Sequence, residues 1–166
     1  MYKRQGVEPE VTEKTGLLLD PYFSATKARW LLKKHKIDPN KYFFGTIDTF
    51  LVWKLTEGKS FKTDVTNASR TSLLNIDSVE WDSNLIDIFE LSGLNLPEVT
   101  KNTTDFGSTK LFGGEIKITG IAGDQQASLI GQGCFATGQL KSTYGTGCFL
   151  MANTGKKRQN SSNKLL

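Results

Sequence analysis

A short run of residues places a carboxylate where a strand turns into a helix. Residues 116–121 alternate in polarity and are rich in β-branched side chains, which predicts a strand. Gly120 and Gly123 then allow a sharp turn, and Asp124 stands at the N-cap position of a following helix. In α/β folds such turns lie at an open edge of the sheet, where ligands bind. The run therefore predicts an α/β protein with Asp124 in a functional position.

A glycine-rich turn follows at residues 142–149. The pattern predicts a strand, a Gly145-Thr146-Gly147 turn and a second strand from Cys148 to Ala152. Glycines on both sides of a hydroxyl leave backbone N–H groups open to phosphate oxygens. Because this turn lies 22 positions after the acid, the two motifs together indicate phosphoryl transfer to a hydroxyl group.

Each motif also has a simpler interpretation. An aspartate ahead of a helix is more commonly a plain N-cap than a base. A Gly-Thr-Gly sequence between two strands is more commonly an ordinary hairpin turn than a ligand loop. The two motifs taken singly do not decide between these interpretations.

Four motifs in order resemble the FGGY carbohydrate kinases, and among them the members that phosphorylate glycerol. Two are central: Gly-Ile-Ala-Gly-Asp-Gln-Gln-Ala at 120–127 and Thr-Tyr-Gly-Thr-Gly-Cys-Phe at 143–149. The others are Asp-Pro-Tyr-Phe-Ser-Ala-Thr-Lys at 20–27 and Thr-Asp-Val-Thr-Asn-Ala-Ser-Arg-Thr at 63–71. The resemblance extends from about Thr15 to Lys157, which is nearly the whole chain.

The resemblance implies a reaction and a set of site residues. The reaction is phosphorylation of glycerol by ATP, with Mg²⁺ entering as the partner of ATP and no metal ligand expected in this chain. Asp124 would be the catalytic base. Tyr22, Asp124, Gln125 and Phe149 would line the glycerol pocket, and Gly145, Thr146 and Gly147 would approach the nucleotide phosphates.

It also implies a fold and a domain division. The family fold is the ribonuclease H-like or actin-like ATPase fold, in which two α/β domains close over the substrates. Residues 1–132 would form the C-terminal part of the first kinase domain, and residues 133–166 the beginning of the second. Since family members are about three times longer, we expect an internal fragment that is inactive alone, from a parent that forms homo-oligomers.

Two other functions stay open. One is a kinase of the same family that acts on another polyol or on a ketose; Tyr22 and Phe149 favour glycerol. The other is a non-catalytic binding protein that has kept the fold.

In some family members a longer, arginine-containing loop near residue 115 binds an inhibitory sugar bisphosphate. Here the loop is shorter and carries Glu115, so we expect this inhibition to be absent or weak.

Composition limits the partners and the location. The net charge of +4 is spread along 166 residues, so it gives no case for nucleic acid, and no apolar run reaches the roughly 20 residues of a membrane span. Cys134 and Cys148 lie in apolar segments without a disulfide framework, which favours reduced thiols in the cytoplasm. His35, the only histidine, is expected at the rim of a helix and not in a catalytic or metal site.

The hydrophobic periodicity predicts several elements upstream of the central motifs. A buried strand is expected at 15–19, and helices are expected at 24–35, after Thr46 up to Gly58, and after a cap at Asp82. The faces expected to be buried are Ala28, Leu31, Leu32 and His35 on the first helix, and Ile47, Phe50, Leu51 and Leu55 on the second. No chemistry is assigned to residues 61–71.

Overall fold

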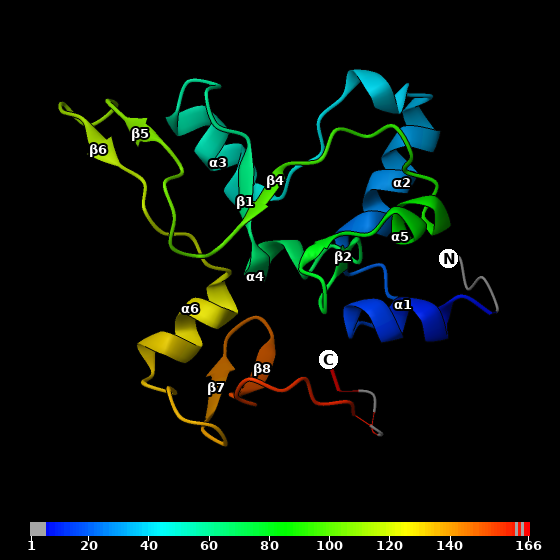
Figure 1. Ribbon diagram of the computed structural model, residues 1–166, viewed down its shortest axis with the longest axis vertical. Helices are drawn as coiled ribbons and strands as arrows, with labels where there is room; N and C mark the ends of the chain where they lie inside the picture. The colour runs from blue at the N-terminus through cyan, green and yellow to red at the C-terminus, as the bar shows by residue number, and fades with distance from the viewer. Residues whose placement is uncertain (1–5, 162, 164) are drawn as a thin grey trace. The chain divides into compact units, whose positions relative to one another are not determined.

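The computed structural model describes residues 6–161, 163, 165 and 166. This part of the chain divides into two compact units, of which the first ends at Ile121 and the second begins at Ala122 (Figure 1). No described helix has the length and the apolar character that crossing a membrane requires.

The first unit contains most of the regular structure. Its helices are α1 (Glu8–Thr15), α2 (Ser24–His35), the 3₁₀ turn η1 (Pro39–Lys41), α3 (Ile47–Leu55), α4 (Val65–Ala68) and α5 (Ser83–Ile88). Its strands are β1 (Lys62–Asp64), β2 (Leu74–Asn75), β3 (Glu80–Trp81), β4 (Glu98–Thr100), β5 (Ser108–Thr109) and β6 (Ile116–Lys117). Strands β1 and β4 pair in parallel, whereas β2 with β3 and β5 with β6 are antiparallel.

The second unit is a helix and a hairpin. Helix α6 (Asp124–Gly131) precedes the antiparallel strands β7 (Leu140–Tyr144) and β8 (Cys148–Ala152), drawn in yellow to orange in Figure 1. The predicted hairpin around the Gly-Thr-Gly turn is therefore present, and α6 is grouped with it.

The hydrophobic core of the first unit joins α1, α2 and α5. Its buried members are Val11, Ala25, Ala28, Leu73, Leu85, Phe89 and Leu91. The side chain of Asp82 accepts the Leu85 N–H at 3.0 Å, which confirms the predicted cap of α5. Trp81 and Ile86 both pack against this core, as expected of residues that flank such a cap.

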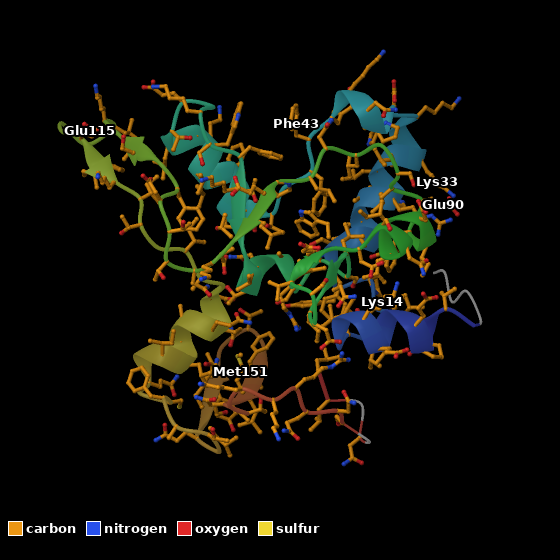
Figure 2. All side chains as sticks on the ribbon, in the orientation of Figure 1. Lys14, Lys33, Phe43, Glu90, Glu115 and Met151 are labelled. Atoms are coloured by element: carbon orange, nitrogen blue, oxygen red, sulfur yellow. The ribbon has the colours of Figure 1, made fainter. Side chains whose placement is uncertain are left out.

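Helix α2 has the predicted limits, but its buried face is displaced. Ala28 is buried as expected, together with Ala25 and Arg29, whereas Leu31 is 45% exposed and His35 is exposed at the last turn. The charge on Glu90, just after α5, explains the displacement, because Arg29 and Lys33 of α2 both pair with it. Figure 2 shows Lys33 and Glu90 beside each other.

Helix α3 begins after Thr46 as predicted but ends earlier than predicted, at Leu55 with Thr56 as its C-cap, and the opposite face is buried. Gly58 closes the C-terminal turn at φ 82°, while the expected inward residues Ile47, Phe50 and Leu51 are 49–69% exposed. The buried face carries Asp48 instead, whose carboxylate accepts hydrogen bonds from the hydroxyls of Thr63, at 2.7 Å, and Thr46. These polar contacts hold α3 against β1.

Two predicted strands are wrong or shorter than expected. Residues 15–19 form no strand, because α1 runs to Thr15 and ends at Gly16 with a left-handed φ of 71°. Residues 116–121 contain only β6 as regular strand, although Ile118 and Ile121 still form backbone hydrogen bonds with Gly107 and Asn102.

Asp64 connects segments that are distant in sequence. It is fully buried and accepts hydrogen bonds from four donors: the backbone N–H and the hydroxyl of Thr66, the Asn67 amide at 2.6 Å and the Asn102 amide at 2.7 Å. The same Asn102 amide also donates to the carbonyl of Ile121 at 3.0 Å. A single carboxylate therefore fixes the end of β1, the start of α4 and the segment that leads into the central turn.

The ion pairs of Glu90 predict a pH-dependent contribution to stability. Hydrogen bonds from Lys33 and Arg29 lower the pKa of Glu90 from its ordinary 4.5 to about 2. Because this pKa is depressed in the folded state, the contribution is complete above pH 4.5 and is lost as the pH falls toward 2. Glu90→Gln should therefore lower the melting temperature at pH 7, with a difference that shrinks below pH 4.5. Glu98→Gln, which loses only a 3.9 Å contact with Lys62, is the control. A difference in melting temperature that stays constant with pH would contradict the lowered pKa of Glu90.

The Asp64 cluster predicts a large loss of stability when its buried acceptor is removed. Asp64→Ala leaves buried donors without an acceptor, which should lower the free energy of unfolding by about 3 kcal/mol. Asp38→Ala is a matched control, since Asp38 also accepts from a backbone N–H and an asparagine amide but is exposed. Urea titration of both variants measures the free energy of unfolding. Equal losses of this free energy in the two variants would show that burial of the Asp64 cluster is unimportant.

Candidate functional site

Asp124 begins helix α6 but does not cap it. The N-cap residue is Gly123, and no side chain forms a capping hydrogen bond there. The prediction of Asp124 as the N-cap is therefore wrong by one position, because the backbone is still non-helical at Gly123 (φ −59°, ψ 146°) and helical from Asp124 onward. Its carboxylate is exposed in the first turn, where the helix dipole favours negative charge. The helix dipole is thus a structural reason for an acid at this position, whereas capping is not.

Gln125 connects Asp124 with the hairpin. Its amide nitrogen Nε2 donates to Oδ2 of Asp124 at 3.1 Å, and its amide oxygen Oε1 accepts from Nζ of Lys141 at 2.5 Å. Lys141 lies on β7 and is only 2% exposed. Nothing in the sequence around Lys141, which stands between Leu140 and Ser142, indicates that its side chain is buried.

Phe149 lies on the side of the hairpin that faces α6. It is paired with Thr143 across the strands, and Lys141 is paired with Met151, so these four side chains share one face. The Thr143 hydroxyl lies 3.4 Å from that of Ser128 on α6. Phe149 is 38% exposed, which leaves part of its ring accessible. The structure thus brings Asp124, Gln125 and Phe149 into one small unit.

The Gly-Thr-Gly turn has two glycines that differ in their surroundings. A Cβ at Gly147 would lie 2.8 Å from the ring of Phe149, so this glycine makes room for the aromatic side chain. A Cβ at Gly145 would meet no atom within 4 Å, and Gly145 has no positive φ. Neither packing nor backbone strain explains this glycine, so close approach of a ligand is a remaining physical reason for it. Thr146 between them is exposed.

Tyr22 belongs to the first unit, on the turn before α2. Its ring is 61% exposed and packs edge-on against Phe23, with the ring centres 5.4 Å apart. Lys27 donates to its carbonyl at 2.7 Å. Arg70 lies over the Phe23 ring, and burial lowers the pKa of this guanidinium. Tyr22 therefore stands on a supported turn with an exposed phenol.

The other features of the described chain do not add a metal site or a deep pocket to these residues. No group of three or more His, Cys, Asp or Glu residues in the described ranges is arranged to hold a metal ion. A hollow of about 710 Å³ lies in the first unit, where Trp30, Leu31 and Phe89 are among its lining residues, and it contains none of the candidate site residues. The candidate site is therefore defined by the chemistry of its side chains.

Comparisons with known proteins identify the family of the chain. Residues 1–131 match the sequence profile of the N-terminal domain of the FGGY family of carbohydrate kinases. A glycerol kinase of Sinorhizobium fredii is 56% identical over 171 residues, which cover 99% of this chain and 34% of that protein. The chain thus spans about a third of the length of the curated relatives that it matches.

Solved structures show the same relationship. The crystal structure of a Plasmodium falciparum glycerol kinase with ADP superimposes with a TM-score of 0.85 at 42% identity, over 93% of this chain and 32% of that one. A gluconate kinase of Lactobacillus acidophilus superimposes with a TM-score of 0.77 at 24% identity, over 89% of this chain and 31% of that one, which shows the shared fold. The chain therefore belongs to the FGGY family of carbohydrate kinases and contains part of their ribonuclease H-like, actin-like ATPase fold.

Proposed function

We propose that the full-length protein carrying this sequence transfers the terminal phosphoryl group of ATP to glycerol. Curated relatives that match 99–100% of the chain are glycerol kinases, and one solved glycerol kinase is described with ADP. The observation that carries the proposal is the carboxylate of Asp124, which is exposed at the start of α6, forms no cap and is hydrogen-bonded by Gln125.

Asp124 acts as the general base in this proposal. A terminal hydroxyl oxygen of glycerol attacks the terminal phosphorus of ATP, the bond between that phosphorus and the bridging oxygen breaks, and ADP leaves. Asp124 accepts the proton of the attacking hydroxyl. Mg²⁺ offsets phosphate charge when it is bound with ATP, and we propose no ligand for it among the described residues.

The other candidate residues bind the two substrates. Gln125 hydrogen-bonds a second hydroxyl, the exposed part of the Phe149 ring lies against the carbon chain, and Tyr22 contributes a phenol from the first unit. Gly145, Thr146 and Gly147 approach the nucleotide phosphates. Because the N–H of Gly145 donates to the carbonyl of Gly147 at 3.0 Å, the backbone donors that we propose for the phosphates are the N–H groups of Thr146 and Gly147. The open space at Gly145 and the exposed side chain of Thr146 support this role.

The proposal includes the setting of the chain in its parent. Residues 1–132 would belong to the first kinase domain and residues 133–166 would begin the second, in a homo-oligomer. The 166 residues alone would be inactive, since they span about a third of the relatives. Cys134 and Cys148 are free thiols, which supports a cytoplasmic location.

Asp124→Asn tests the base in the full-length protein. The amide cannot accept the proton, so kcat for glycerol-dependent ADP release should fall by about 10²–10⁴-fold with little change in KM. Asp105→Asn is the control, since this exposed aspartate accepts the N–H of Gly107 in the first unit. An unchanged kcat with a raised KM for glycerol would instead make Asp124 a binding group.

A second prediction concerns inhibition by sugar bisphosphates. Glu115 lies at the end of the β5–β6 hairpin (Figure 2), and its carboxylate accepts the Ser108 hydroxyl at 2.8 Å. An acid there repels phosphate, so fructose bisphosphate at millimolar concentration should leave the full-length enzyme's activity unchanged. Loss of activity at modest concentrations would contradict this, and Glu115→Gln would then show whether the charge matters.

A further inference from the structure

Lys141 is a buried cation beside the proposed base. Its side chain is 2% exposed, and its ammonium donates to two acceptors, the Gln125 amide oxygen at 2.5 Å and the Thr143 hydroxyl at 2.8 Å. Both acceptors are uncharged. No carboxylate of the described residues pairs with this ammonium, and burying an ammonium on uncharged acceptors is unfavourable, so packing alone does not explain a lysine at this position.

The charges on its two sides fix the orientation of the Gln125 amide. An ammonium only donates hydrogen bonds, so the amide presents its oxygen to Lys141. An ionised carboxylate only accepts, so the amide presents its nitrogen to Asp124, at 3.1 Å. A flipped amide would place its nitrogen against the ammonium and its oxygen against the carboxylate, and both contacts would be repulsive.

We propose that Lys141 is a positioning residue that selects this orientation of Gln125 for substrate binding. One N–H of the amide is used by Asp124, and the other remains as a donor to a substrate hydroxyl oxygen. Asp124 remains the acceptor for the proton of a neighbouring hydroxyl. The pair thus suits a vicinal diol, in which one hydroxyl accepts a hydrogen bond while the next one donates. This inference rests on the proposed function.

A purely structural role for Lys141 gives different expectations. The ammonium bridges α6 and β7, and its second acceptor, Thr143, lies near Ser128 of α6. If it only held these elements together, its loss would destabilise the protein and leave the kinetics of the folded fraction unchanged. If it positions Gln125, its loss changes glycerol kinetics without lowering stability, because a buried ammonium is replaced by an apolar side chain.

Lys141→Met in the full-length protein separates the two roles, and Thr143→Val is the matched control because it removes the other acceptor of Lys141. Lys141→Met should lower kcat/KM for glycerol by about 10- to 100-fold, with an unchanged KM for ATP and no fall in melting temperature. Thr143→Val should change kcat/KM by less than about threefold. An unchanged kcat/KM in folded Lys141→Met, or equal losses in both variants together with lower melting temperatures, would overturn the proposal.

A second readout does not depend on turnover. In protein labelled with ¹⁵N in glutamine side chains, the Gln125 amide signals are assigned by their absence in Gln125→Glu. These signals should shift in Lys141→Met and stay in place in Thr143→Val. Their constancy in Lys141→Met would overturn the inference. Absence of turnover in the unmutated protein would instead reject the proposed function.

Discussion

The buried carboxylate of Asp64 is the interaction on which the first unit most depends. It accepts four hydrogen bonds, two from Thr66, one from Asn67 and one from Asn102, and its side chain is fully buried. A buried carboxylate is stable only when such donors satisfy it. Since Asn102 is 38 residues further along the chain, this cluster can form only after the chain has folded back on itself.

The same cluster holds Ile121, at the end of the first unit. Asn102 contacts Ile121 twice, since its amide donates to the Ile121 carbonyl and its carbonyl accepts the Ile121 N–H at 2.9 Å. Asp124 follows only three residues later. After the turn, the hydrogen bond from Gln125 holds the carboxylate, and Lys141 holds Gln125. The proposed role of Asp124 as a general base requires a carboxylate held in this way, because proton transfer depends on geometry as well as on acidity.

Local sequence rules identified α2, α3, α5 and α6 but not α1 or α4, and they predicted the buried faces of α2 and α3 poorly. The limits of α2 and α3 follow from their flanking turns, and Asp82 caps α5 as expected. Periodicity alone could not show that Glu90 draws Arg29 inward, or that Asp48 turns the polar face of α3 toward β1. Both displacements depend on partners 15 to 61 residues away, which no local pattern contains.

The parts of the candidate site that are set by local sequence could be predicted. The hairpin, its glycine turn and the helix that begins at Asp124 follow from residues 116–152. Asp64 and Lys141 were not predicted as important, because their significance comes from burial. Asp64 resembles a helix cap and Lys141 an ordinary strand lysine until long-range contacts surround them.

The central claim is phosphoryl transfer to glycerol, and the identity of the phosphorylated product tests it most directly. The full-length protein would be incubated with ATP and with glycerol, other polyols or pentuloses in parallel, and the products followed by phosphorus NMR. We predict glycerol 3-phosphate, formed at a kcat/KM well above that for any other acceptor. A higher kcat/KM with a ketose, or no phosphorylated product from glycerol, would contradict the account.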